Sequence, residues 1–142
     1  MLTAYSDMSL CKTGAAGAAI LMDGDTMVDY TLQRLTEVDT SYQGELLALT
    51  FAMQLVSENY DTPQRVTIYS DCKAVVKKAV ECLNRSKILP SWACSEDWQR
   101  FLDYKGDHMV KVKHIPSHQE KRSFNVICDY AARIIAKLDE GD

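Results

Sequence analysis

Two short apolar segments of the chain each end in the dipeptide Ser-Asp. They are residues 2–7 and 66–71, and each has the pattern of a buried β-strand with its aspartate at the carboxyl edge of a sheet. Parallel strands place their carboxyl ends at one edge, so we expect Asp7 and Asp71 to lie side by side. In open α/β sheets this edge is where reactive groups and ligands gather. The repeated segment therefore predicts an α/β fold with a site at that edge.

The rest of the hydrophobic pattern predicts the element order βββαβααβα. The expected strands are 2–7, 16–22, 26–35, 65–70 and 109–114, and the expected helices are 42–59, 71–83, 95–104 and 124–138. Asp23-Gly24-Asp25 between two apolar runs is typical of a hairpin, and Ser95 is the expected N-cap of the third helix. The pattern predicts a five-stranded mixed sheet flanked by helices, in one domain spanning residues 1–142.

Composition limits the class of protein. No apolar run approaches the roughly 20 residues that span a bilayer, and the N-terminus has no signal-peptide pattern. Five cysteines without a C-x-x-C pair indicate reduced thiols. We therefore expect an intracellular, cytoplasmic protein with no membrane association, and the nucleus or an organelle stays open.

Charge is unevenly distributed along the chain. Residues 1–64 hold two basic and nine acidic side chains, a net of −7, whereas residues 65–142 hold fourteen and eleven, a net of +3. The two halves sum to the net charge of −4. Either a basic face lies on the second half, or its lysines and arginines merely solvate helix surfaces.

Four carboxylates come from four separated segments. Glu45 is expected in the first turn of the helix 42–59, and Asp129 lies near the start of the last helix, so both can project over the edge that holds Asp7 and Asp71. A lone aspartate at a strand end is usually a cap or a solvated residue, so the argument rests on the whole set. Converging acids repel one another unless a cation lies among them, and oxygen ligands suit Mg²⁺ or Mn²⁺. Two such ions about 3.5–4 Å apart support phosphodiester cleavage. The three histidines have no partners at zinc spacing.

Five motifs carry a resemblance to a known family. They are Ser6-Asp7-Met8-Ser9, the segment 43–49 (QGELLAL), Tyr69-Ser70-Asp71-Cys72, the loop 116–119 (PSHQ) and the segment 125–133 (NVICDYAAR). In this order they resemble Thr-Asp-Gly-Ser, Glu-Leu-x-Ala, Thr-Asp-Ser, the Gly-His loop and Asn-x-x-x-Asp-x-x-Ala of the type 1 ribonuclease H family. That family includes the ribonuclease H domains of retroviral reverse transcriptases. The resemblance covers nearly the whole chain and implies the ribonuclease H-like fold.

The resemblance implies hydrolysis of the RNA strand of RNA·DNA hybrids, leaving 3′-hydroxyl and 5′-phosphate ends. It implies two Mg²⁺ ions, with Mn²⁺ as a substitute. By position, Asp7 would bridge both ions, Glu45 and Asp71 would complete one metal site, and Asp129 would hold the ion that activates water. His118 would assist proton transfer or product release.

The resemblance also implies contacts with the hybrid. The positions expected to touch the minor groove, riboses or a DNA phosphate, or to steady the last helix, are Ser9, Thr40, Ser41, Tyr42, Gln43 and Asn125. Ser, Thr and Asn at helix starts are more often caps. We expect no obligate protein partner, and either a monomer or a domain of a larger polymerase-type protein.

Three features depart from the family pattern. Met8 stands in place of a glycine, so we expect added bulk beside Asp7 where RNA approaches. The connector 84–94 holds only Arg85 and Lys87, which predicts a reduced basic handle, and one extra residue separates His118 from Asp129. Two alternatives stay open: a catalytically silent nucleic-acid-binding or scaffold module, and another two-metal nuclease of the same fold, such as a resolvase or an exonuclease. The presence of all four carboxylates favours the enzyme.

Overall fold

A computed structural model describes residues 1–10, 15–36, 38–85 and 87–115. The predicted last helix, with His118, Asn125 and Asp129, lies outside the described residues. The described part contains β1 (Leu2–Leu10), β2 (Ala15–Asp23), β3 (Thr26–Leu35), α1 (Ser41–Asn59), β4 (Arg65–Ser70), α2 (Lys73–Arg85), α3 (Ser95–Lys105) and β5 (Met109–His114). This order confirms the predicted βββαβααβ over the described range.

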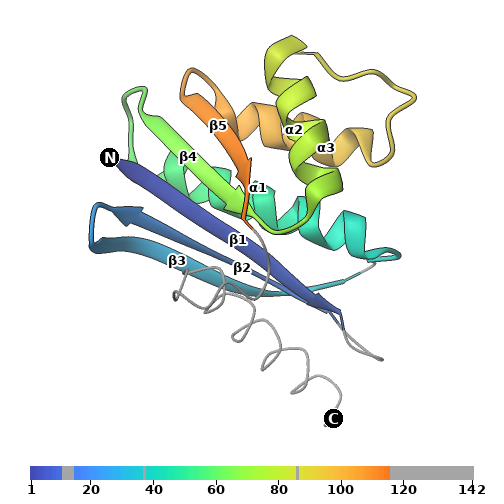
Figure 1. Cartoon of the computed structure of the whole chain (residues 1–142), viewed down its shortest axis with the longest axis horizontal. Coiled ribbons are helices and arrows are strands. Elements are labelled where there is room, and N and C mark those ends of the chain that lie inside the picture. The colour runs from blue at the N-terminus through green and yellow to red at the C-terminus, as the bar shows by residue number, and fades with distance from the viewer. Residues whose placement is uncertain (11–14, 37, 86, 116–142) are drawn as a thin grey trace, which may run out of the picture.

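The five strands form one mixed sheet in the order β3-β2-β1-β4-β5 (Figure 1). β1 and β2 pair antiparallel, as do β2 and β3, whereas β4 runs parallel to both β1 and β5. Ser6 pairs with Ser70, so Asp7 and Asp71 follow matched positions on neighbouring parallel strands. The α/β class and the parallel pairing of the two Ser-Asp segments are confirmed.

The first strand is longer than predicted. β1 continues past Asp7 to Leu10, whereas its parallel pairing with β4 ends at Ser6. Beyond that point β1 keeps an antiparallel partner, and Asp7 to Leu10 pair with Ala18 to Ala15 of β2. The prediction that β1 ends at Asp7 is therefore wrong. Asp7 nevertheless lies where the parallel ladder stops.

The predicted hairpin is confirmed. A two-residue turn, Gly24-Asp25, joins β2 to β3, and Gly24 has a φ of 59°. This left-handed conformation favours glycine. The Gly24 N–H donates to the Met1 carbonyl at 3.1 Å, which ties the turn to the start of β1.

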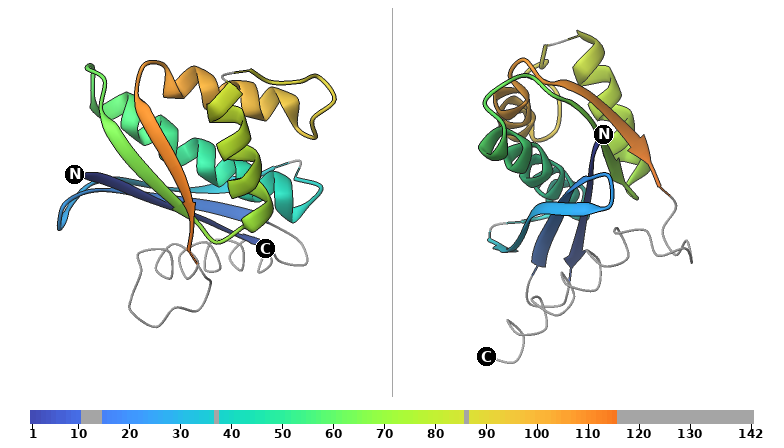
Figure 2. Two further views of the ribbon diagram at one scale, coloured as in Figure 1. Left: turned by 45° about the horizontal axis from the view of Figure 1, so that its top comes forward. Right: turned by 90° about the vertical axis from the view of Figure 1, so that its left-hand side faces the viewer.

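One hydrophobic core joins the sheet to the three described helices. α1 packs across β1 and β2, α3 packs against α1, and α2 packs against β5 (Figure 2). α1 turns one apolar face toward the sheet, and Leu46, Leu49, Met53 and Val56 on that face are fully enclosed. Within the described residues, no helix is long and apolar enough to cross a membrane.

Two helix starts differ from the prediction. α2 begins at Lys73 rather than Asp71, because the Cys72 N–H first bonds to Ser70 Oγ at 3.2 Å, so Asp71 lies in a short turn before the helix. α3 has Cys94 rather than Ser95 at its N-cap. Cys94 is left-handed, with a φ of 59°, and its side chain makes no capping bond. On α2, Ala74 is exposed and Val76 is buried.

Candidate active site

Three of the four predicted carboxylates meet at the carboxyl end of the parallel strands. Asp7 comes from β1, Glu45 from α1 and Asp71 from the turn after β4, and one carboxylate oxygen of each lies within 4.8 Å of the others. Asp7 and Glu45 are 3% and 7% exposed, and Asp71 is half-buried. The sheet topology and the helix start bring these segments together, as the sequence indicated.

The start of α1 sets the direction of Glu45. Thr40 caps the helix, because its Oγ1 accepts the Gln43 N–H at 3.2 Å, and Gln43 Oε1 accepts the Asp39 N–H at 3.2 Å. This reciprocal pair resembles a capping box and fixes where the first turn lies. Since the helix begins at Ser41, Glu45 lies just past the first turn rather than in it, which corrects the sequence prediction.

A single backbone N–H connects two of the carboxylates. Met8 N–H donates to Asp7 Oδ1 at 2.8 Å and to Glu45 Oε1 at 3.0 Å. Hydrogen bonds from a backbone amide to a carboxylate are charge-assisted and strong. The bridging bond therefore ties the start of α1 to β1 at the site.

The electrostatics of the three carboxylates are unfavourable without a cation. Burial raises the pKa of Glu45 well above its ordinary value of 4.5. The charges of Asp7 and Asp71 and a hydrogen bond with Asp71 raise this pKa further, and the Met8 N–H opposes the shift. A divalent cation relieves this repulsion, and oxygen ligands at about 2.0–2.6 Å from an ion lie roughly 3–5 Å apart. The observed spacing and the all-oxygen donor set fit such a cation.

Comparison with known proteins identifies the family. Residues 1–137 match the RNase H family. The chain belongs to the RNase H family. None of the curated proteins matches the sequence by direct comparison.

Solved structures of RNase H proteins share the fold at low sequence identity. The N-terminal RNase H domain of Rv2228c from Mycobacterium tuberculosis is similar over 99% of this chain and 96% of its own, with a TM-score of 0.79 and 11% identity. LC11-RNase H1 in complex with an RNA/DNA hybrid covers 87% of this chain and 91% of its own, with a TM-score of 0.65 and 14% identity. The foamy viral protease-reverse transcriptase in complex with an RNA/DNA hybrid covers 94% of this chain but 19% of its own, with a TM-score of 0.72 and 16% identity. These likenesses establish the RNase H-like fold.

Among the described residues, the positions that the family resemblance implicates in hybrid binding lie close to Asp7 or Glu45 along the chain. Thr40 and Ser41 are exposed and Gln43 is partly exposed, all just before Glu45 on α1. Ser9 is 9% exposed and pairs with Ala16 within the sheet. The structure thus presents the helix start to solvent and encloses most of Ser9.

Tyr42 has a partner that sequence reasoning missed. Trp98 of α3 is fully buried, and its Nε1–H donates to the Tyr42 hydroxyl at 3.1 Å. Burial raises the pKa of Tyr42, so the hydroxyl keeps its proton and can donate it onward. Nothing in the sequence indicated that Trp98 would bond to Tyr42.

Met8, the residue after Asp7, is turned into the protein. Its side chain is 8% exposed and packs with Ala15, Ala48 and Leu35 between the sheet and α1. Met8 therefore places its bulk between the sheet and α1 rather than on the exposed surface beside Asp7. The alternation of side chains along β1 turns Met8 toward the helix, away from the face that carries Asp7.

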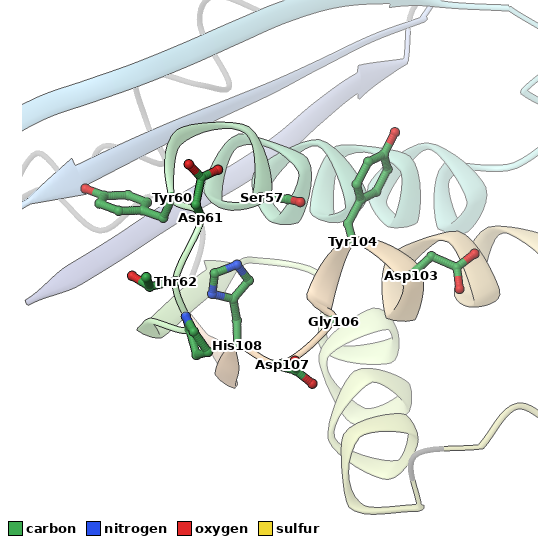
Figure 3. A pocket seen from close by; sticks show the side chains of 10 residues that line it. Ser57, Tyr60, Asp61, Thr62, Asp103, Tyr104, Gly106, Asp107 and His108 are labelled. Atoms are coloured by element: carbon green, nitrogen blue, oxygen red, sulfur yellow. The ribbon is translucent and has the colours of Figure 1, made fainter.

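A polar pocket of about 300 Å³ lies at the opposite end of the parallel strands (Figure 3). It is lined by the end of α1, the loop before β4 and the turn before β5, including Ser57, Tyr60, Asp61, Thr62, Asp103, Tyr104, Asp107 and His108. His108 is 8% exposed, and its Nδ1 accepts the Gln64 N–H at 2.9 Å. Since this pocket faces the amino ends of β4 and β5, it is separate from the carboxylate site.

Proposed function

We propose that this RNase H family member is a metal-dependent endoribonuclease that cuts the RNA strand of RNA·DNA hybrids, leaving 3′-hydroxyl and 5′-phosphate ends. The observation that carries the proposal is the buried convergence of Asp7, Glu45 and Asp71. Two RNase H-containing proteins of the same fold have been solved with RNA/DNA hybrids, which supports the substrate class.

The three carboxylates fit a cofactor of Mg²⁺, with Mn²⁺ as a substitute. We propose that Asp7 would be a ligand of both ions. Glu45 and Asp71 would complete the site of the first ion, and Asp129 would contribute to the site of the second. Two ions held there would supply an activated water and would stabilise the charge on the leaving 3′ oxygen.

The chain's own groups hold this arrangement. Met8 N–H orients one oxygen each of Asp7 and Glu45, and the enclosure of both side chains limits bulk water around them. At the start of α1, Thr40, Ser41, Tyr42 and Gln43 offer hydroxyl and amide groups to the hybrid beside the site. Ser9 and Asn125 are proposed as weaker contacts, and His118 is proposed to move a proton or aid product release.

We propose that residues 1–142 act as one domain inside the cell, in the cytoplasm, nucleus or an organelle, with no obligate protein partner. A monomer and a domain of a larger polymerase-type protein both fit this proposal. The foamy viral match, in which this chain spans 19% of a reverse transcriptase, illustrates the second arrangement.

The test is cleavage of one labelled RNA strand, presented as RNA·DNA hybrid, duplex RNA or single strand, with Mg²⁺, Mn²⁺ or EDTA. We expect cleavage of the hybrid alone, and only with metal. The variant Asp71→Asn should lose cleavage by at least about 10³-fold while keeping hybrid affinity within a few-fold.

The same experiment separates the alternatives. Hybrid binding with no cleavage under any condition would indicate a catalytically silent module. Cleavage of the DNA strand, monitored by labelling that strand of the same hybrid instead, would indicate another two-metal nuclease. An Asp71→Asn variant that cuts hybrid at the wild-type rate would contradict the proposed site.

A further inference from the structure

Gly44 immediately precedes Glu45 on α1, and the Met8 side chain covers it. Met8 Sδ and Cγ lie 3.4 and 3.5 Å from the position that a Cβ on residue 44 would take, and Met8 Cε overlaps that position. Gly44 is buried. A larger residue at position 44 therefore requires Met8 to move.

Met8 has little room to move. It is 8% exposed and sits in a small apolar cluster with Ala15, Ala48 and Leu35. Protein interiors are close-packed, so a side chain confined in this way transmits added volume to its neighbours. The neighbour on one side is the backbone of α1, directly before Glu45.

The backbone of Met8 acts on the same carboxylate. Its N–H donates to Glu45 Oε1 at 3.0 Å and to Asp7 Oδ1 at 2.8 Å. One residue of β1 therefore sets the separation between strand and helix with its side chain and orients Glu45 with its amide. Glu45, in turn, must reach to within 4.8 Å of Asp7 and Asp71.

We propose that Met8 and Gly44 form a size-matched pair that positions Glu45 within the metal-binding set. Met8 fills the space that the missing side chain of Gly44 leaves, and the fit fixes how far α1 stands from β1 at the site. Both are positioning residues, since neither offers a side chain to the ion. The inference rests on the proposed metal site.

The test measures Mn²⁺ affinity by calorimetry on the metal-free protein, so it does not depend on cleavage. Helix propensity alone favours alanine over glycine, so Gly44→Ala would otherwise be benign. If the pair sets the spacing, Gly44→Ala should weaken Mn²⁺ binding about 10- to 100-fold, the range for changes that disorient a metal ligand. Met8→Ala keeps the backbone N–H that donates to Glu45 and should weaken Mn²⁺ binding by less than Gly44→Ala does.

The decisive variant combines the two changes. Met8→Ala with Gly44→Ala exchanges volume across the contact and should restore Mn²⁺ affinity to within about threefold of wild type, a strongly non-additive result. Ala52→Gly, fully buried two turns further along α1, is the matched control. It should lower the melting temperature and leave Mn²⁺ affinity unchanged.

The outcomes separate the two proposals. Wild-type protein that binds no Mn²⁺ would overturn the metal site and this inference together. Wild-type binding with unchanged affinity in Gly44→Ala would overturn the inference alone. If Gly44→Ala does not fold, the double variant decides: near-wild-type affinity supports the pair, and affinity no better than tenfold below wild type overturns it.

Discussion

Both ends of the parallel strands carry several acidic side chains, but only one end forms a site among the described residues. At the carboxyl end, Asp7, Glu45 and Asp71 converge and are largely enclosed. At the amino end, three aspartates around the polar pocket, Asp61, Asp103 and Asp107, are exposed and point apart (Figure 3). The difference shows that burial and convergence, rather than the number of acids, determine whether a group of carboxylates needs a cation to offset its repulsion.

The largest expected effect comes from substituting a carboxylate at the carboxyl end of the parallel strands. Asp7→Asn removes a charge from the buried set and should lower hybrid cleavage by at least about 10³-fold. The matched control at the other end, Asp107→Asn, should leave cleavage within about twofold of wild type. Rates of hybrid cleavage in Mg²⁺ measure both, and equal losses in the two variants would contradict the distinction between the ends.

Without metal, substituting Glu45 should raise the stability of the protein, although the same change should lower its activity. Glu45→Gln removes a carboxylate whose burial and acidic neighbours raise its pKa in the folded protein. In EDTA this variant should therefore be more stable than wild type near pH 7, by on the order of 1–3 kcal/mol. For a domain of this size the gain corresponds to a rise in melting temperature of about 3–10 °C.

The pH dependence of this difference has a defined sign. The pKa of Glu45 is higher in the folded than in the unfolded state. The stability that protonated Glu45 contributes to the folded protein is therefore fully present below the ordinary pKa of 4.5 and is lost as pH rises from there toward the folded-state pKa. The advantage of Glu45→Gln should thus be small at pH 5 and grow toward pH 8. Thermal unfolding across this range in EDTA measures it, and added Mg²⁺ should stabilise wild type but not the variant. An advantage that shrinks with pH would contradict the assignment.

The bond between Tyr42 and Trp98 connects the start of α1 to α3 beside the carboxylates. Tyr42→Phe removes the hydroxyl and keeps the ring, so we expect hybrid to bind about two- to tenfold more weakly, as for one lost hydrogen bond. The rate of cleavage at saturating hybrid should stay within about twofold. Trp98→Phe should weaken hybrid binding similarly and also lower stability, and a double variant no weaker than either single variant would show that the pair acts as a unit. A loss confined to the cleavage rate would contradict a binding role.

The sequence predicted the part of this site that backbone pattern determines. The Ser-Asp ends of β1 and β4 and the amphipathic α1 indicated where Asp7, Glu45 and Asp71 would meet. The hydrogen bond between Trp98 and Tyr42 and the packing of Met8 against Gly44 join segments far apart in the chain. Such contacts leave no local pattern in the sequence. The end of β1 was misplaced for a related reason, because pairing with β2 extends the strand beyond its apolar run. Asp129, His118 and Asn125 lie outside the described residues and stay predictions.

The smallest expected effect is a difference between substitutions of two neighbouring lysines of α2. Lys78 bonds to Glu81 at 3.1 Å and lies 4.3 Å from the centre of the Trp92 ring, whereas Lys77 is exposed and has no ion pair within the described segments. If the second half of the chain presents a basic face to the hybrid, Lys77→Ala should weaken binding by about two- to fivefold and lower the slope of log affinity against log salt by up to about 1. Lys78→Ala should change binding less and lower the free energy of unfolding by about 0.5–1 kcal/mol, because it removes a partly exposed cation–π contact and ion pair. Hybrid binding at 50 and 200 mM salt, with unfolding in urea, measures both. Identical binding by the Lys77→Ala variant and wild type would indicate that this lysine only solvates the helix, the simpler explanation of the uneven charge.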